Sequence, residues 1–335
     1  MALDTQISSF CDMIEKGEGP VRVEGERLVV GRDPGDELPE SVKQLHSLLA
    51  GVMPHVELTD LIIRMDAACG FSQHLTHSAG ASRCGPDMLT HLYAAIVSQA
   101  TNLGPTAKAR ASDLSYDQIA HASAWYLRDE TLTAAIDAVI NYHHQLPATK
   151  QWGDGTFSSS DGQRFPISVE AANSGALPRY FGFGKGISVL TSVSNHYATS
   201  GTKIIPAGAR EGIYALDEIF ALRERNSDLE LDEHTTDTAG FTDLLFGVYD
   251  LVGLKFSPRI RNVADQRLWH LEPNAFANTP LNGHRVNRAL IEDHWDDLLR
   301  IGASIHSGTV LPSLLLSKLQ CSRARTRLHV QVSCG

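Results

Sequence analysis

Two short aspartate motifs constrain the fold of this chain more than any other feature of its sequence. Asp161 follows three serines and precedes Gly162, and Asp237 lies in the run TTDTAG (235–240). Each aspartate comes at the end of a stretch whose composition predicts a β-strand. The sequence between them predicts a hairpin and then a helix, so the two strands can be neighbours in one sheet. Carboxylates on neighbouring strand ends are what a pair of Mg²⁺ ions needs for an in-line displacement at phosphorus.

Either aspartate also has a simpler interpretation. An Asp beside a Gly is commonly a turn former, and Asp237 can cap the helix predicted from Thr242. For each residue alone, the turn interpretation is favoured. The order of the predicted elements changes this balance, because it brings both acids to the same edge of a sheet.

The pattern of elements predicts an α/β fold, a ribonuclease-H-like mixed sheet flanked by helices and preceded by a mostly helical domain. The order is strand, hairpin, helix, strand, helix, strand. A Gly-rich hairpin and linker region is expected over residues 1–40. The remaining predicted regions are a helical domain (41–146), the ribonuclease-H-like core (147–320) and a tail without a core face (321–335), which we interpret as a non-native continuation.

Composition limits the class of protein. The 335 residues are 42% hydrophobic and 20% charged, which is typical of a globular protein, and no apolar run predicts a membrane span. Five scattered cysteines without a CxxC pair favour a reducing compartment, and we expect a cytoplasmic protein. The net charge is −10, yet from Leu251 onward 11 Lys and Arg stand against 6 Asp and Glu. This basic third permits a local surface that faces DNA.

Several runs resemble one known family. They are WGDGTFSSSDGQRF (152–165), YFGFGKG (180–186), HTTDTAGFTD (234–243) and FSPRIR (256–261), and shorter matches lie in the helical half. In this order they are similar to the transposases of the Tn3 family, the class II replicative transposons. The resemblance runs from about Thr5 to about Leu319.

This resemblance implies a DDE recombinase, which uses two Asp and one later Glu to hold two Mg²⁺ ions. Asp161 matches the first acid and Asp237 the second, as catalytic residues and metal ligands. The implied partners are DNA, at the transposon ends and the target, and full-length transposase; neither a membrane nor a nucleotide cofactor is implied. Members of the family are about three times longer, and their catalytic Glu lies farther past the second Asp than this chain extends.

The third acid therefore decides between the hypotheses. Glu272, Glu292 and Asp293 fall at positions that are non-catalytic in the family, so the resemblance predicts a defective transposase. An alternative is a catalytically dead remnant that binds DNA or transposase. A further alternative, an unrelated two-metal phosphohydrolase, needs Glu233 or Asp243 to complete its site.

Three basic residues are candidate DNA contacts. Lys185 lies in a Gly-rich run that does not fit GxxxxGK[ST], so a hairpin turn is favoured over a nucleotide cradle, and its side chain is placed to touch a phosphate. Arg259 and Arg261 follow a predicted strand near the acids. Exposed salt bridges and phosphate contacts are equally good interpretations of these two arginines.

Overall fold

The computed structural model describes residues 2–25, 27–31, 38–80, 86–168, 171, 173–225, 230–238, 240–261, 268–271 and 282–321. The chain divides into two compact units, one of residues 36–152 and one of residues 1–35 together with 153–335. Glu272 and the predicted tail beyond Cys321 lie outside the described residues. Among the described residues, no helix combines the length and the apolar character that crossing a membrane requires.

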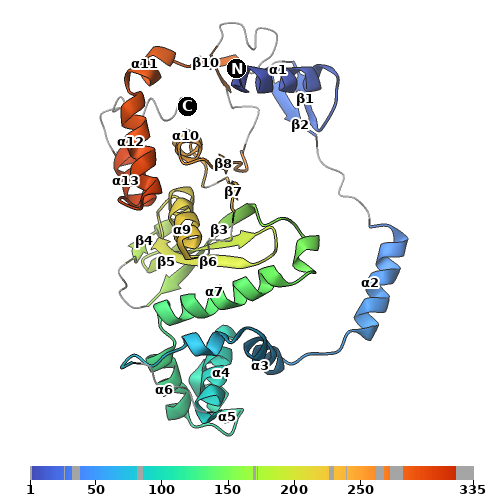
Figure 1. The fold of residues 1–335 in the computed structure, drawn as a ribbon, viewed down its shortest axis with the longest axis vertical. Coiled ribbons are helices and arrows are strands. Elements are labelled where there is room, and N and C mark those ends of the chain that lie inside the picture. The colour runs from blue at the N-terminus through green and yellow to red at the C-terminus, as the bar shows by residue number, and fades with distance from the viewer. Residues whose placement is uncertain are drawn as a thin grey trace. The chain divides into compact units, whose positions relative to one another are not determined.

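The unit of residues 36–152 is helical (Figure 1). A core formed by Leu75, Leu92, Ile119 and their neighbours packs its main helices together. Local signals fix the helix ends: Ser115 and Gln118 form a capping box, and Gly70 ends a helix in the left-handed conformation at φ 67°. The helices are α2 (Glu40–Val52), α3 (Leu58–Cys69), α4 (Pro86–Ala100), α5 (Gly104–Arg110), α6 (Tyr116–Tyr126) and α7 (Asp129–Gln145), with short 3₁₀ turns η1 (Phe71–His74) and η2 (Thr149–Gln151).

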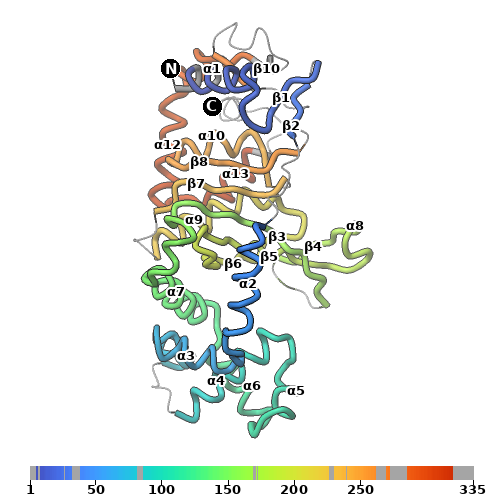
Figure 2. The backbone as a smooth tube through the Cα atoms, turned by 90° about the vertical axis from the view of Figure 1, so that its right-hand side faces the viewer, coloured from blue at the N-terminus to red at the C-terminus, as the bar shows by residue number. Residues whose placement is uncertain are grey.

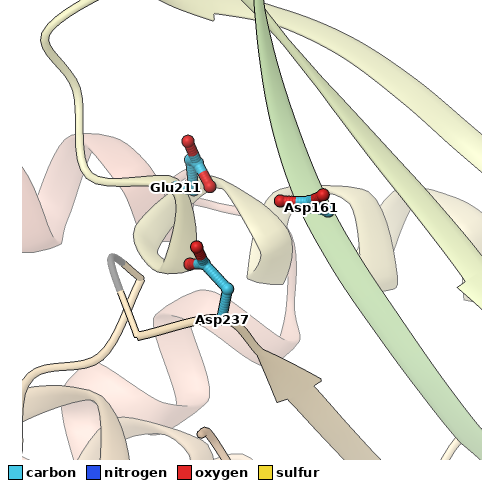
Figure 3. A group of neighbouring side chains, drawn as sticks. All are labelled: Asp161, Glu211 and Asp237. Atoms are coloured by element: carbon cyan, nitrogen blue, oxygen red, sulfur yellow. The ribbon is translucent and has the colours of Figure 1, made fainter. Parts of the chain in front are cut away.

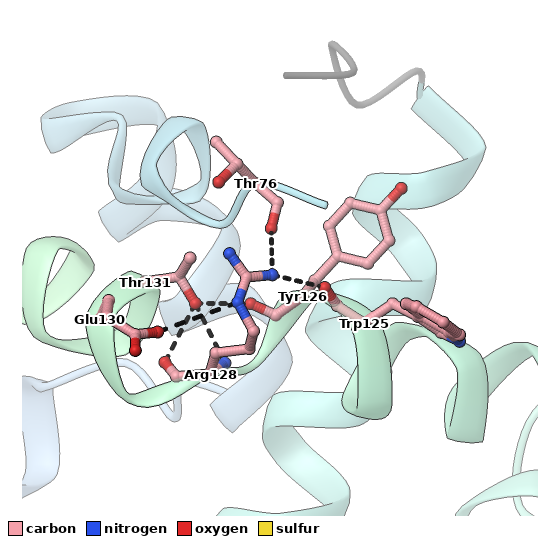
Figure 4. A network of polar contacts seen from close by, with 6 residues as sticks. All are labelled: Thr76, Trp125, Tyr126, Arg128, Glu130 and Thr131. Atoms are coloured by element: carbon pink, nitrogen blue, oxygen red, sulfur yellow. Dashed lines mark hydrogen bonds and ion pairs between the residues drawn. The ribbon is translucent and has the colours of Figure 1, made fainter. Parts of the chain in front are cut away.

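A polar network fixes the joint between α6 and α7 (Figure 4). The guanidinium of Arg128 donates to the carbonyl oxygens of Thr76, at 2.9 Å, and Trp125, at 2.7 Å. The Thr131 hydroxyl donates to the carbonyl of Tyr126 at 2.6 Å. Backbone carbonyls that the helix ends leave without helical partners are thus satisfied by side chains.

The N-terminal segment contains a helix that the sequence did not predict. α1 (Ala2–Glu15) precedes the antiparallel hairpin of β1 (Val21–Glu24) and β2 (Arg27–Val30), which forms where a hairpin is predicted. Phe10, Cys11 and Ile14 pack against Leu28 of the hairpin. The glycines of this region suggested a linker, although the apolar residues before them already have helical spacing.

A mixed sheet forms the centre of the second unit. Its strand order is β4-β5-β3-β7-β8, with β6 also paired to β5; β3 is antiparallel to β5 and parallel to β7. The predicted α/β class with a mixed sheet is confirmed, and the parallel β3–β7 pair agrees with a ribonuclease-H-like topology. The strands are β3 (Phe157–Ile167), β4 (Gly175–Ala176), β5 (Lys185–Ser194), β6 (Thr199–Pro206), β7 (Glu233–Thr236) and β8 (Lys255–Phe256).

Helices cover this sheet through one apolar core. Leu216 of α9 (Glu211–Arg225), Leu245 and Tyr249 of α10 (Asp243–Leu251) and Leu316 of α13 (Pro312–Cys321) are all buried in it. α12 (Trp295–His306) contributes Leu298 and Ile305. The remaining described elements are α8 (Pro178–Phe181), the parallel pair β9 (Leu268–His270) and β10 (Asn282–Arg285), and α11 (Arg288–Asp293).

One predicted hairpin is wrong in its turn. The sequence predicts a hairpin over 179–194 that turns near 184–186, but residues 178–181 form α8, and β5 begins at Lys185. The tight turn lies instead at residues 195–198, between β5 and β6, where Tyr197 has a φ of 60°. Pro178 is preorganised for the first turn of a helix, and Gly182, at φ 57°, ends it.

Candidate metal centre

The register of β3 and β7 places the two predicted acids side by side. The parallel pairing runs from Phe157 opposite Glu233 to Ser160 opposite Thr236. Asp161 is the next residue of β3, and Asp237 directly follows the last residue of β7. The prediction of a strand end is therefore wrong for Asp161, because β3 continues to Ile167. Because adjacent strands lie about 4.8 Å apart, this register alone brings the two aspartates to one edge of the sheet.

A third carboxylate, which the sequence analysis did not single out, completes the group. Glu211 lies in the first turn of α9, and one carboxylate oxygen from each of Asp161, Glu211 and Asp237 lies within 4.8 Å of the other two. Figure 3 shows the three side chains converging from a strand, a helix and a strand end. A signal for Glu211 was present, since it shares a helix face with the buried residues Ala215 and Ile219.

Glu211 is buried among charges. Only 4% of the residue is exposed, and an Arg164 Nη lies 3.4 Å from its carboxylate. Burial raises the pKa of the Glu211 carboxyl, and the negative charge of Asp237 raises it further. The proximity of Arg164 and a hydrogen bond from the Gly162 backbone lower it in part. Burial and the nearby Asp237 thus disfavour the charged form of Glu211, and a cation at this position would favour it.

Two glycines allow the three segments to meet. A Cβ at Gly162 would lie 2.2 Å from the carboxylate carbon of Glu211, and a Cβ at Gly212 would lie 2.2 Å from the carbonyl oxygen of Gly240. A larger residue at Gly212 would push α9 away from the backbone after β7, and one at Gly162 would displace the carboxylate of Glu211. The neighbouring backbone also orients the aspartates, because Gly162 N–H donates to Asp161 at 2.9 Å and Gly240 N–H to Asp237 at 3.2 Å.

A buried histidine ties the two strands together behind the acids. His234 of β7 is 1% exposed, and its ring nitrogens lie 2.8 Å from the hydroxyl of Ser158 and 3.0 Å from that of Ser160, both on β3. Burial lowers the pKa of His234 to about 4, so its imidazole is neutral at pH 7. With one nitrogen donating and the other accepting, this ring links β7 to β3 within three residues of each aspartate.

The predicted DNA contacts separate into two groups. Arg259 and Arg261 are exposed, and the backbone N–H of Arg259 donates to the carbonyl of Thr236 at 2.9 Å, directly beside Asp237. Lys185 is also exposed, but it pairs with Ile167, six residues along β3 from Asp161, which is about 20 Å at the rise of an extended strand. The structure does not bring Lys185 to the acids.

Other acids considered in the sequence stay outside the group. Among the described residues, the cluster with possible metal-ligand spacing consists of Asp161, Glu211 and Asp237 alone. Glu233 lies at the start of β7 and Asp243 in the first turn of α10, so neither completes the site of an unrelated phosphohydrolase. Glu292 and Asp293 belong to α11.

The donor set fits a hard divalent cation. All three groups offer carboxylate oxygens, the ligands that Mg²⁺ and Mn²⁺ prefer. Opposite oxygens around Mg²⁺ are separated by about 4.2 Å, close to the 4.8 Å within which these oxygens lie. A small closing movement of the side chains is enough for one ion to contact more than one of them.

Comparisons with known proteins agree with these motifs. The chain matches the family model of the Tn3 transposase DDE domain over residues 60–332. It is 35% identical over 320 residues to the transposase for transposon Tn501 from Pseudomonas aeruginosa, covering 95% of this chain and 32% of the relative. It is 36% identical over 285 residues to the transposase for transposon Tn21 from Escherichia coli, covering 84% and 28%. The chain thus spans about a third of the length of the curated relatives it matches.

Proposed function

Because the chain belongs to the Tn3 transposase family, whose DDE domain it matches over most of its length, we propose that it carries a metal centre at which transposon DNA is cut and joined. The observation that supports this proposal best is the register of β3 and β7, which aligns Asp161 with Asp237. A divalent metal follows from the family, and Mg²⁺ is the ion that we propose.

In this proposal each residue of the centre has a distinct task. Asp161, within β3, and Asp237, at the end of β7, would hold the metal between them, and Glu211 would close the site from α9. A divalent metal held by these carboxylates would supply charge stabilisation for the attacking oxygen and for the leaving 3′ oxygen of the cut strand. Ser158, Ser160 and His234 keep the two strands in register, so the aspartates keep their spacing.

The substrate of this proposal is DNA, at the transposon ends and the target. A chain with a net charge of −10 needs local cations to hold phosphate beside three carboxylates. Arg259 and Arg261 supply them next to Asp237, on the exposed segment after β8. Lys185, on β5 opposite Ile167, is too far from Asp161 to reach the same phosphate and serves a more distant one.

Metal binding tests the centre first. Mn²⁺, followed by its electron paramagnetic resonance signal, is expected to bind the parent chain and to bind Asp161→Asn and Asp237→Asn at least tenfold more weakly. Glu233→Gln is the matched control, because it removes an acid of β7, close in sequence to Asp237, that lies outside the cluster. Equal Mn²⁺ affinity in the parent and both aspartate variants would refute the proposed centre.

DNA cleavage tests the activity. A supercoiled plasmid that carries transposon ends is incubated with the chain and Mg²⁺ or Mn²⁺, and nicked and joined products are measured. The sequence predicts a defective transposase, but Glu211 supplies a third carboxylate beside the two aspartates. We therefore expect products, and these should disappear in both aspartate variants. Bound Mn²⁺ and bound DNA without any product would instead favour the alternative of a DNA-binding remnant without catalysis.

A salt titration tests the basic residues separately. Arg259→Ala and Arg261→Ala are each expected to weaken DNA binding and to reduce its dependence on salt by about one counterion. Arg300→Ala is the control, since Arg300 is an exposed arginine of α12 that pairs with Asp297. Unchanged salt dependence in both variants would remove these arginines from the DNA surface.

A further inference from the structure

An exposed aromatic side chain on α8 lies near two arginines, Arg179 of the same helix and Arg164 of β3. Tyr180 is 53% exposed, and the guanidinium of Arg164 lies 4.8 Å from the centre of its ring. The guanidinium of Arg179 lies 5.7 Å from the same centre. Phe183, two residues after the helix, is fully exposed. Figure 2 shows α8 extending away from the strands at the β4 side of the sheet.

Tyr180 contributes to no described hydrophobic core, although its neighbour anchors the helix. The ring of Phe181 packs over Gly186, where an added Cβ would lie 2.2 Å from its atoms. This contact fixes α8 against the start of β5. Tyr180 is therefore held in place at the surface without being buried, and its ring remains available to a ligand.

Arg164 connects this surface to the acids. It lies three residues beyond Asp161 on β3, with one end of its guanidinium beside Glu211, at 3.4 Å, and its plane over Tyr180. Its Nε is buried and has no hydrogen-bond partner among the described residues. A buried donor without a partner costs free energy unless a ligand satisfies it.

We propose that Tyr180, flanked by Arg164 and Arg179, is a stacking site for an unpaired nucleobase of the DNA strand that reaches the acid cluster. Aromatic rings and guanidinium planes are the groups on which proteins stack bases, and the arginines also attract the phosphates. Three residues of β3 span about 10 Å, the length of about three stacked nucleotides of one strand. The stacked base therefore lies within a few nucleotides of the reacting phosphate. This inference rests on the proposed function, which supplies the strand.

Binding of single-stranded DNA tests the stacking site. An oligonucleotide with one 2-aminopurine is titrated with the full chain in EDTA, so that metal binding plays no part. Stacking on a tyrosine quenches the fluorescence of 2-aminopurine. We expect Tyr180→Leu to abolish the quenching and to weaken binding about tenfold, since one stacked base contributes roughly 1–3 kcal/mol. Tyr180→Phe is expected to restore both, because it retains the ring.

The controls separate this inference from the metal centre. Tyr116→Leu removes a tyrosine of similar exposure, 51%, from α6 of the other unit, and it should leave both signals unchanged. Asp237→Asn should retain the quenching while losing Mn²⁺. Quenching and affinity that persist in Tyr180→Leu would overturn the stacking site and leave the metal centre standing. A misfolded chain would lose both signals, so loss of Mn²⁺ binding with intact quenching in Asp237→Asn shows that this variant is folded.

Discussion

In the helical unit, the buried carboxylate of Asp66 receives hydrogen bonds from the backbone N–H of Ser72, at 2.8 Å, and from the hydroxyl of Tyr93, at 2.5 Å. At the strand ends of the other unit, the buried carboxylate of Glu211 instead faces Asp161 and Asp237. The first carboxylate is fully paired and stabilises the fold. The second is gathered with like charges, which costs stability unless a cation is present. A buried carboxylate therefore suggests a binding site when, like Glu211, it lies among other carboxylates, and a structural role when, like Asp66, hydrogen bonds satisfy it.

A third buried carboxylate shows that this difference does not simply follow the two units. Asp217 of α9 lies six residues from Glu211, on the same helix. Its carboxylate accepts from Lys203 at 3.0 Å, from the Ser313 backbone at 2.8 Å and from the Ser313 hydroxyl at 2.6 Å. These contacts attach α13 to α9. Like Asp66, Asp217 is a structural acid.

The largest effect on stability is expected for Asp217→Ala. The change leaves the buried N–H of Ser313 without its partner and leaves Lys203 with Glu218, at 3.6 Å, as its remaining carboxylate. Breaking such a buried pair costs about 3–5 kcal/mol. Urea unfolding of the parent and the variant measures the loss. Asp250→Ala, an exposed acid at the end of α10, should change stability by less than about 0.5 kcal/mol. An equally small loss in Asp217→Ala would show that Asp217 is not a structural acid.

Acid should destabilise the fold through His234. Its folded-state pKa of about 4 lies below the ordinary value of 6.5, so the unfolded chain takes up the proton first as the pH falls. Stability from this residue is fully present above pH 6.5 and is lost between pH 6.5 and 4. The loss is on the order of 3 kcal/mol. Urea midpoints measured across this range should fall more steeply for the parent than for His234→Gln. Parallel curves would contradict a buried neutral imidazole.

Divalent metal bound at Asp161, Glu211 and Asp237 should raise the free energy of unfolding. Binding to the folded state alone adds about 2.7 kcal/mol at a hundredfold excess over the dissociation constant. Differential scanning calorimetry in Mn²⁺ and in EDTA measures the shift in melting temperature. The shift should vanish in Asp161→Asn and persist in Asp66→Asn, whose carboxylate lies in the helical unit. Equal shifts in both variants would show that the metal binds elsewhere.

The sequence predicted the aspartate pair because the two strands and the elements between them could be read from local pattern. It placed Asp161 at a strand end, however, whereas β3 continues to Ile167. The sequence analysis did not identify Glu211, because it interpreted the helix that became α9 from its apolar residues alone. An acid on the same face as Ala215 and Ile219 was the available signal. The sequence analysis found no third acid, whereas the structure places Glu211 in the group. Glu211 precedes Asp237 in the chain, so it does not match the later Glu of the family motif.

The misplaced turn explains the prediction for Lys185. Its Gly-rich run suggested the tip of a hairpin, but glycine also ends short helices and accommodates close contacts. Here Gly182 ends α8, and Gly186 accommodates the ring of Phe181. Sequence pattern locates glycines without saying which of these uses applies. The pairing of Lys185 with Ile167 depends on register, which only the folded sheet defines.

The smallest and most direct test changes one charge in each kind of acid. In EDTA at pH 7, Glu211→Gln is expected to stabilise the chain by about 1 kcal/mol, because it relieves burial of charge and repulsion from Asp237 at the cost of a 3.4 Å ion pair with Arg164. Asp66→Asn is expected to destabilise by about 1–2 kcal/mol, since its hydrogen bonds lose their charge. Urea unfolding measures both changes, and adding Mn²⁺ should reverse the advantage of Glu211→Gln by stabilising only the parent. Equal signs for the two substitutions in EDTA would mean that Glu211 is as well paired as Asp66, and the distinction between structural and metal-binding acids would fail at its central residue.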